Sequence, residues 1–263
     1  MVRKIDKSYY IFLTFIPFLC IMLDLFLSTT AANKENIRGA INFDVSIINQ
    51  SMYLSVWIAF ATSLYGLANW IAMDWPNAIP KWVISKNNDT RMLSYNVFSF
   101  ILYNGTLLIS VFSSVNNIVG FNTWYKILKS VLEHMIVPVV MVVYYFLRVK
   151  PRENNKEYIV KWSWFSLIMP TVYFLYVTVR YIMLNAYYPT IFDDQGNAIG
   201  GANTMFPYAQ MIPGKIGWVG YFFWCLGLFV TMWGFCIGFN ALSNVTHRKL
   251  AEKFNLKESL IVK

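Results

Sequence analysis

The sequence has few charged residues for its length. Of its 263 residues, 22 are Lys or Arg and 13 are Asp or Glu, which together make only 13% of the chain. A soluble domain carries roughly 25% charged residues to cover its surface. Hydrophobic residues make up 57% of the chain and aromatic residues 18%. The composition therefore excludes a soluble, a disordered or a collagen-like protein, and it predicts a membrane protein.

The sequence also lacks the short motifs of several chemistries. Its three cysteines, Cys20, Cys225 and Cys236, all lie inside apolar runs, and an odd number there argues against a disulfide framework. The chain contains no CxxC or HExxH spacing for a metal, no phosphate-binding loop and no dinucleotide fingerprint. We therefore expect neither a metal nor a cofactor.

Six apolar runs are long enough to cross a hydrocarbon core, which takes about 20 helical residues. We place these spans near residues 8–29, 47–73, 92–115, 124–148, 160–185 and 216–241. The remaining residues are too few for a separate globular domain. We therefore expect residues 1–263 to form one all-α integral membrane domain, a six-helix transmembrane bundle. Residues 242–263 would follow it as a basic, amphipathic tail.

The net charge of +9 follows from the distribution of Lys and Arg between the two sides of these spans. Only five basic residues lie on the side where the second, fourth and sixth spans begin: Lys34, Arg38, Lys126, Lys129 and Lys215. Most lie on the other side: Arg3, Lys4, Lys7, Lys81, Lys86, Arg91, Arg148, Lys150, Arg152, Lys156, Lys161, Arg248, Lys249, Lys253, Lys257 and Lys263. By the positive-inside rule, the N-terminus and C-terminus are cytoplasmic and the protein lies in the cell membrane. The charge is thus a topology signal, and we expect no nucleic-acid partner.

Four ionisable residues fall inside the predicted spans: Asp24, Glu133, His134 and Arg180. Such residues are costly in hydrocarbon and are candidates for function by default. His134 is the most informative, because the chain has only two histidines and the other lies in the tail. Pro138, one turn further along, frees a backbone carbonyl beside the imidazole. A histidine that only fixes helix packing is an equally good interpretation.

Arg180 lies near the outer interface of the fifth span. It shares a helical stripe with Pro170 and Tyr173, and Tyr176 is close to that stripe, so we expect Arg180 to face protein. A guanidinium there can hold the carboxylate or phosphate of a lipid, or it can extend toward the headgroups. Asp24 would be its counter-ion only if the two residues lie at matching depths.

The polar start of the second span offers three hydroxyl groups for His134: those of Ser46, Ser51 and Ser55. Serine in a membrane helix is usually a small packing residue. At 1.5 Å per residue, His134 and Ser46 differ in depth by roughly 15 Å. Ser55 matches the depth of His134 better, and Ser51 is intermediate. The depth estimate therefore favours Ser51 or Ser55.

The pattern resembles the androgen-induced-protein and androgen-dependent TFPI-regulating protein family, which includes a bacterial branch of six-helix membrane proteins. The resemblance covers most of the chain. It is carried by the polar start of the second span, by His134 with Pro138, by a series in the fifth span and by an aromatic-Pro-Tyr element before the sixth. The last two are Trp164, Pro170, Tyr173, Tyr176 and Arg180, and Phe206-Pro207-Tyr208.

Characterised animal members of this family hydrolyse esters of hydroxy fatty acids with a threonine nucleophile and a histidine. The resemblance implies that His134 is the catalytic histidine. It also implies that Ser46 is the nucleophile, because Ser46-Ile47-Ile48-Asn49-Gln50 matches a Thr-x-x-Ser-Asn run of the bacterial branch. Serine stands here where the family has threonine.

Our first hypothesis is therefore an intramembrane hydrolase of fatty acyl esters. Ser46 attacks, with Ser51 and Ser55 as fallback nucleophiles, and His134 is the general base. Arg180, Tyr173, Tyr176, Asn49 and Gln50 would contact a membrane lipid substrate. The alternative is a non-catalytic lipid-binding protein or small-solute transporter whose cavity uses the same polar groups. A third possibility is an interaction scaffold.

Overall fold

A computed structural model of the protein describes residues 2–30, 43–112, 123–148, 152–189, 191–192, 198–202 and 206–253. Six helical segments are long and apolar enough to cross a membrane: Arg3–Leu27, Leu54–Asp74, Lys86–Phe112, Trp124–Leu147, Asn155–Tyr187 and Pro213–Leu250. The described part of the chain is therefore that of a multi-pass, helical membrane protein.

The described residues form nine α-helices, with short π and 3₁₀ stretches between some of them, and α2 lies outside the six segments. The first four α-helices are α1 (Val2–Thr30), α2 (Phe43–Ser51), α3 (Leu54–Asp74) and α4 (Lys86–Phe112). The fourth segment runs through α5 (Trp124–Val131), the π-helix η1 (Leu132–Ile136) and α6 (Val137–Leu147). The fifth runs through α7 (Asn155–Glu157), the π-helix η2 (Tyr158–Trp162), the 3₁₀ helix η3 (Ser163–Leu167) and α8 (Ile168–Tyr187).

The connection before the last helix contains a small antiparallel hairpin. It pairs β1 (Ile191–Phe192) with β2 (Ala198–Gly200) and is followed by the 3₁₀ turn η5 (Ala209–Met211). The last helix, α9 (Pro213–Lys253), bends at Gly217, whose φ of 72° favours glycine. It continues through most of the predicted tail, and residues 254–263 lie outside the described part of the chain.

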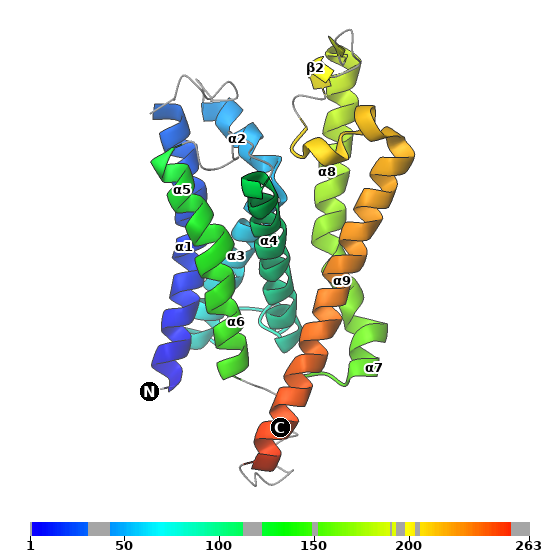
Figure 1. Ribbon diagram of the computed structural model, residues 1–263. Coiled ribbons are helices and arrows are strands. Elements are labelled where there is room, and N and C mark those ends of the chain that lie inside the picture. The colour runs from blue at the N-terminus through cyan, green and yellow to red at the C-terminus, as the bar shows by residue number, and fades with distance from the viewer. Residues whose placement is uncertain are drawn as a thin grey trace.

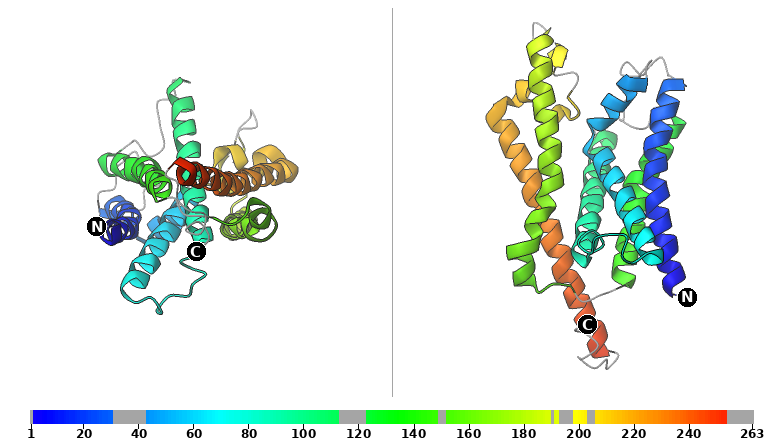
Figure 2. Two further views of the ribbon diagram at one scale, coloured as in Figure 1. Left: turned by 90° about the horizontal axis from the view of Figure 1, so that it is seen from below. Right: turned by 180° about the vertical axis from the view of Figure 1, so that it is seen from behind.

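The helices run side by side along one axis (Figure 1). We call the end of the bundle where α1 begins and α9 ends the terminal end. The other end, where α2 and the hairpin lie, we call the opposite end. The two further views in Figure 2 show α8 and α9 together on one side of the bundle, apart from α1 and α6. The hydroxyl groups of Thr178 and Tyr221, 2.7 Å apart, join α8 to α9.

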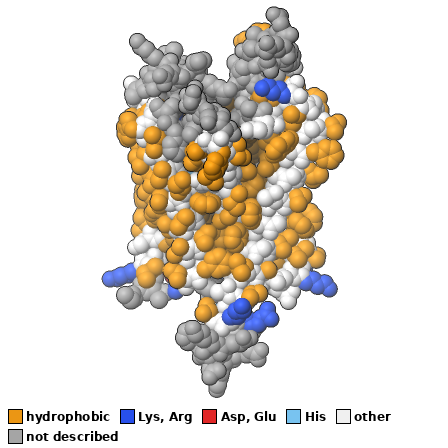
Figure 3. All heavy atoms as spheres, in the orientation of Figure 1, with side chains coloured by type: hydrophobic (Ala, Val, Ile, Leu, Met, Phe, Trp, Pro, Cys, Tyr) orange, Lys and Arg blue, Asp and Glu red, His pale blue; other side chains and the backbone are white. Residues whose placement is uncertain are grey.

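The surface agrees with a position in the membrane. Orange hydrophobic side chains cover the middle of the face shown in Figure 3, and the blue Lys and Arg side chains lie near its two ends. Large apolar side chains such as Phe112, Leu147 and Val219 are more than two-thirds exposed. In a lipid bilayer this exposure needs no further partner, because acyl chains are as apolar as the side chains.

The predicted span 47–73 is divided in two, because the helix breaks at Met52 and Tyr53 between α2 and α3. Such a break leaves backbone groups without helical partners, which is costly in a membrane unless protein groups replace them. Here, tyrosines from distant segments do so. The Tyr173 hydroxyl donates to the carbonyl of Met52, and the Tyr208 hydroxyl accepts from the Leu54 N–H at 3.0 Å.

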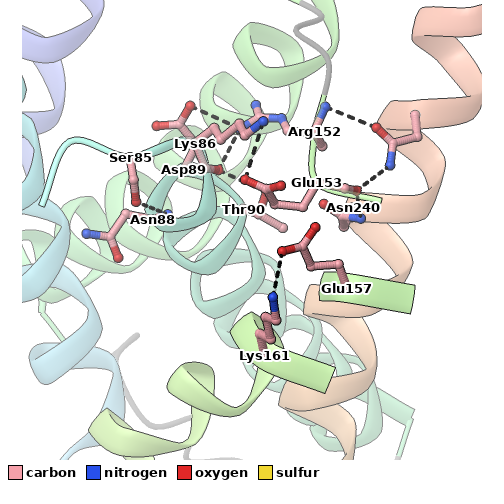
Figure 4. Close-up of polar contacts among 11 residues, drawn as sticks. Ser85, Lys86, Asn88, Asp89, Thr90, Arg152, Glu153, Glu157, Lys161 and Asn240 are labelled. Atoms are coloured by element: carbon pink, nitrogen blue, oxygen red, sulfur yellow. Dashed lines mark hydrogen bonds and ion pairs between the residues drawn. The ribbon is translucent and has the colours of Figure 1, made fainter. Parts of the chain in front are cut away.

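At the terminal end, a buried arginine connects three parts of the bundle (Figure 4). One Nη of Arg152 donates to the carbonyl of Lys86 at 2.6 Å and to the carboxylate of Asp89 at 3.2 Å. The guanidinium lies 4.3 Å from the centre of the Tyr145 ring. The Arg152 N–H donates to Asn244 of α9 at 3.0 Å. This network fixes α4, α6 and α9 relative to one another.

Candidate functional site

The candidate site is built around His134, which lies in the π-helix η1. The wider turn closes with a hydrogen bond from the Val137 N–H to the carbonyl of Leu132. Pro138 has no N–H to donate to the carbonyl of His134, and the side-chain amide of Asn104 donates to that carbonyl instead, at 3.2 Å. Single π turns are frequent at functional sites. The freed carbonyl expected from the sequence is thus present, and α4 supplies its partner.

The imidazole of His134 is buried against α4. Its Nδ1 lies 3.1 Å from the Ser99 hydroxyl. The Tyr103 ring stacks on it, with 3.9 Å between ring centres and 9° between planes. On the other side, Nε2 is 3.9 Å from Oε1 of Glu133, which is longer than a hydrogen bond. A hydroxyl and a carboxyl group therefore lie on the two nitrogen sides of one imidazole.

Glu133 is more deeply buried than is usual for a carboxylate, with 5% of the residue exposed. Neither of its carboxyl oxygens has a hydrogen-bond partner among the described residues. A buried polar group without such a partner is costly, and a charged one is much more so. Glu133 is therefore an exception to normal burial that requires a physical explanation.

Next to Glu133 lies a second pair of ionisable groups. Lys129 of α5 and Asp24 of α1 form an ion pair of 2.8 Å, and both side chains are at most 15% exposed. Lys129 also interacts with the charge of Glu133, four residues further along the helix. The counter-ion of Asp24 is therefore Lys129, and the pairing with Arg180 that the sequence left open is not formed. Six residues separate Asp24 from the end of α1, so the pair lies about 9 Å below the opposite end of that helix.

The three serines predicted as nucleophiles lie around the start of the second span. Ser46 is buried in α2. The Ser51 hydroxyl donates to the carbonyl of Ile48 at 2.8 Å and lies 2.7 Å from the Tyr176 hydroxyl of α8. Ser55 is half-buried in the first turn of α3. The hydroxyl that hydrogen-bonds to His134 is that of Ser99, which sequence reasoning missed.

The predicted substrate-binding residues gather near the break between α2 and α3. Tyr173 and Tyr176 contact Met52 and Ser51, so their stripe faces protein as expected. Arg180, on the same stripe, lines a narrow crevice that has no room for a water molecule, together with Met52, Val177, Tyr181, Leu184, Ala202, Phe206 and Pro207. Asn49 is half-buried. The buried amide of Gln50 has no hydrogen-bond partner among the described residues.

Tyr208 connects this region electrostatically with Glu133. Burial raises the pKa of its phenol to about 12, although the hydrogen bond from the Leu54 N–H acts in the opposite direction. The charge of Glu133 contributes a smaller increase. Tyr208 is therefore neutral at physiological pH and can donate as well as accept a hydrogen bond.

A second pocket lies at the terminal end, beside the Arg152 network. It has room for about one water molecule, at roughly 10 Å³. Four tyrosines, two arginines, Asp89 and two apolar residues line it: Tyr9, Tyr65, Asp89, Leu93, Met141, Tyr144, Tyr145, Arg148 and Arg152. Neither of these two pockets includes Ser99 or His134.

One sequence signal could have pointed to the missed residues. Ser99, Tyr103 and Asn104 are polar residues of the third span at spacings of four and five, which places them near one face of α4. Nothing in the sequence indicated that this face packs against His134. Among the described residues, no group of three His, Cys, Asp or Glu side chains is placed to hold a metal ion.

Comparison of the chain with models of protein families, with curated proteins and with solved structures finds no match.

Proposed function

We propose that the protein is an intramembrane hydrolase of lipid acyl esters in which Ser99 is the nucleophile and His134 the general base. The observation that carries this proposal is the distance of 3.1 Å between the Ser99 hydroxyl and Nδ1 of His134. A nucleophile and its base need to lie within about 3 Å of each other. Ser99 replaces Ser46 in this role because it is the hydroxyl that hydrogen-bonds to the imidazole.

In the proposed reaction, Nδ1 of His134 accepts the Ser99 proton as Oγ attacks the ester carbonyl. The C–O bond to the alcohol then breaks, and the leaving alkoxide takes the proton from Nδ1. Water next gives a proton to Nδ1 and attacks the acyl-enzyme, and Ser99 Oγ leaves with that proton. Stacking on Tyr103 and the hydrogen bond from Asn104 hold the histidine in place throughout.

The location of the pair supports a lipid as the substrate. Ser99 lies halfway along α4, and the neighbouring residues Ile101 and Leu102 are more than 40% exposed on a membrane-facing surface. An acyl chain dissolved in the bilayer could therefore reach α4 laterally. The resemblance described above implies an ester of a hydroxy fatty acid, whose distal carboxylate would suit Arg180.

The test is an assay of purified protein on fluorogenic acyl esters in mixed micelles. We expect Ser99→Ala and His134→Gln each to lower turnover by about 100-fold or more, because general-base catalysis contributes at least that much. Ser46→Ala, Ser51→Ala and Ser55→Ala are the matched controls and should keep most of the activity. Full turnover in Ser99→Ala would exclude Ser99 as the nucleophile. Full turnover in His134→Gln would contradict the proposed mechanism.

A second candidate function is lipid binding or transport without catalysis. The observation that favours it is the crevice that Arg180 lines with Met52 and Phe206, because the residues lining it do not include His134. This function predicts binding of a fatty acid that is weakened by Arg180→Gln and unaffected by Ser99→Ala. A fluorophosphonate probe distinguishes the two functions, because labelling of Ser99 supports hydrolysis and absence of labelling supports binding.

A further inference from the structure

His134 has two ring nitrogens, and only one of them carries hydrogen when the imidazole is neutral. Nδ1 lies 3.1 Å from the Ser99 hydroxyl, and Nε2 lies 3.9 Å from Oε1 of Glu133. A hydroxyl can donate or accept, so Ser99 is compatible with hydrogen on either nitrogen. A carboxylate only accepts, so it favours hydrogen on the nitrogen that faces it. The group beside Nε2 therefore decides whether Nδ1 is free to act as a base.

The acidic and basic side chains around this end of η1 balance each other. The charge of Lys126 interacts with that of Asp24, and the charge of Lys129 interacts with that of Glu133 more strongly than with that of Asp24. These two ammonium and two carboxylate groups together carry no net charge, as a position within a membrane favours. Glu133 is thus balanced by a cation and faces His134 as a carboxylate.

The carboxylate of Glu133 has unused capacity to accept hydrogen bonds. Both of its oxygens are buried, and neither has a hydrogen-bond partner among the described residues. A buried acceptor in this condition is costly, so a donor close to it is expected. Hydrogen on Nε2 of His134 would point such a donor toward Oε1, and the distance of 3.9 Å can shorten as the site closes on a substrate.

We propose that Glu133 is a positioning residue, which fixes His134 in the form with hydrogen on Nε2 and so keeps Nδ1 free to accept the proton of Ser99. The use of this form in catalysis rests on the proposed hydrolysis, whereas the form itself does not. When Nδ1 accepts the Ser99 proton, the imidazole becomes a cation, and the carboxylate beside Nε2 stabilises it. Glu133 neither gains nor loses a proton in these steps.

The experiment is nitrogen NMR of the purified full chain in lipid nanodiscs at neutral pH, with ¹⁵N-labelled histidine. The His247→Gln background leaves His134 as the only histidine of the chain. We expect one set of signals, from an Nε2 that carries hydrogen and an Nδ1 that does not. Glu133→Met removes the carboxylate and keeps an unbranched side chain. In that variant we expect a second set of signals, from imidazole with hydrogen on Nδ1.

Two further variants keep this result interpretable. Glu133→Gln retains the size of the side chain, and it should also produce the second set of signals, because an amide can present either its oxygen or its NH₂ group to Nε2. Glu157→Gln is the control, because Glu157 is exposed and paired with Lys161 at 3.1 Å. Its spectrum should match that of the parent protein.

Ester turnover supplies the second readout. We expect kcat to fall by at least about 10-fold in Glu133→Met and Glu133→Gln, because imidazole with hydrogen on Nδ1 cannot accept the Ser99 proton. KM should change little, because Glu133 faces the ring nitrogen that does not contact Ser99. A loss of kcat at constant KM is typical of a lost transition-state interaction and not of weaker substrate binding.

Three NMR results would overturn the proposal. They are hydrogen on Nδ1 in the parent protein, hydrogen on both nitrogens at neutral pH, and hydrogen on Nε2 alone in both Glu133 variants. Unchanged kcat in both variants of an active enzyme would overturn the catalytic role of Glu133. Absence of turnover in the unaltered protein would contradict the proposed hydrolysis and leave the NMR result standing, so the two failures are distinguishable.

Discussion

At the scale of single residues, burial separates the ion pairs of this protein into two kinds. The side chain of Arg152 is 2% exposed, and it satisfies the carbonyl of Lys86 and the carboxylate of Asp89. Lys161 and Glu157 form an ion pair on the surface, where both side chains are more than 40% exposed. Removing one partner from a buried pair leaves an uncompensated charge, whereas exposed pairs contribute little.

We therefore expect Arg152→Gln to lower the free energy of unfolding by about 3 kcal/mol. Lys161→Gln, the matched control, should change it by less than about 0.5 kcal/mol. Thermal unfolding of the two variants in the same detergent measures the difference. Equal midpoints for both variants would contradict the assignment of Arg152 as an anchor between α4, α6 and α9.

The candidate site contains one residue that the sequence predicts, His134, and one that it does not, Ser99. His134 was identified because it is a rare ionisable residue inside a span, and the structure places it beside a hydroxyl, a carboxyl and an aromatic ring. Its partner Ser99 was missed because depth arithmetic compares heights along helices. Residues on several helices share the depth of His134, and the depth estimate does not show which of these helices packs against it.

At the scale of helices, α1 and α3 pack so closely that one contact admits only glycine. A Cβ atom added to Gly66 would lie 2.7 Å from the Thr14 nitrogen and 2.9 Å from two atoms of Leu13. The Ser63 hydroxyl donates to the carbonyl of Thr14 at 2.6 Å in the same contact. Small residues allow this close approach. In a membrane such close packing stabilises helix association, because the hydrophobic effect does not drive helices together there.

We expect Gly66→Ala to destabilise the protein by about 1–3 kcal/mol, because backbone atoms of α1 must move. Gly227→Ala is the control. An added Cβ there meets nothing within 4 Å, and alanine improves helix propensity by about 0.5–1 kcal/mol. The measurement is again the unfolding midpoint. The close packing of α1 on α3 would be refuted if Gly66→Ala were as stable as Gly227→Ala.

The break between α2 and α3 illustrates a feature of helices that the local sequence did not reveal. The run from residue 47 to residue 73 is apolar enough to predict one helix. The break at Met52 and Tyr53 is tolerated because Tyr173 and Tyr208 reach the exposed backbone groups from more than 100 residues away. Only the packing of α8 and its following loop supplies those partners.

At the scale of the whole molecule, the bundle has a more basic terminal end. The described basic residues there include Arg3, Lys7, Lys86, Arg148 and Arg152, whereas Lys126 and Lys215 lie toward the opposite end. The positive-inside rule therefore predicts that the terminal end faces the cytoplasm and that His134, nearer the opposite end of its span, is reached from the outer leaflet.

Single cysteines introduced by Lys4→Cys and Lys215→Cys test this orientation, in a background in which Cys20, Cys225 and Cys236 are replaced by alanine. A membrane-impermeant maleimide added to intact cells should label the variant at position 215 and not the one at position 4. Permeabilised cells are the control and should show labelling of both. The reverse pattern in intact cells would invert the predicted topology.

The sequence by itself determined the class of this protein: a chain with so few charges and six long apolar runs can bury its backbone polar groups only as helices in a membrane. The hydropathy of a segment is the sum of the values of its own residues, so it can be calculated without knowing which residues are in contact. The tertiary structure alone decided that Ser99 meets His134, that Asp24 pairs with Lys129, and that the carboxyl oxygens of Glu133 have no hydrogen-bond partner among the described residues. These contacts join helices far apart in sequence, and their geometry depends on which faces pack together.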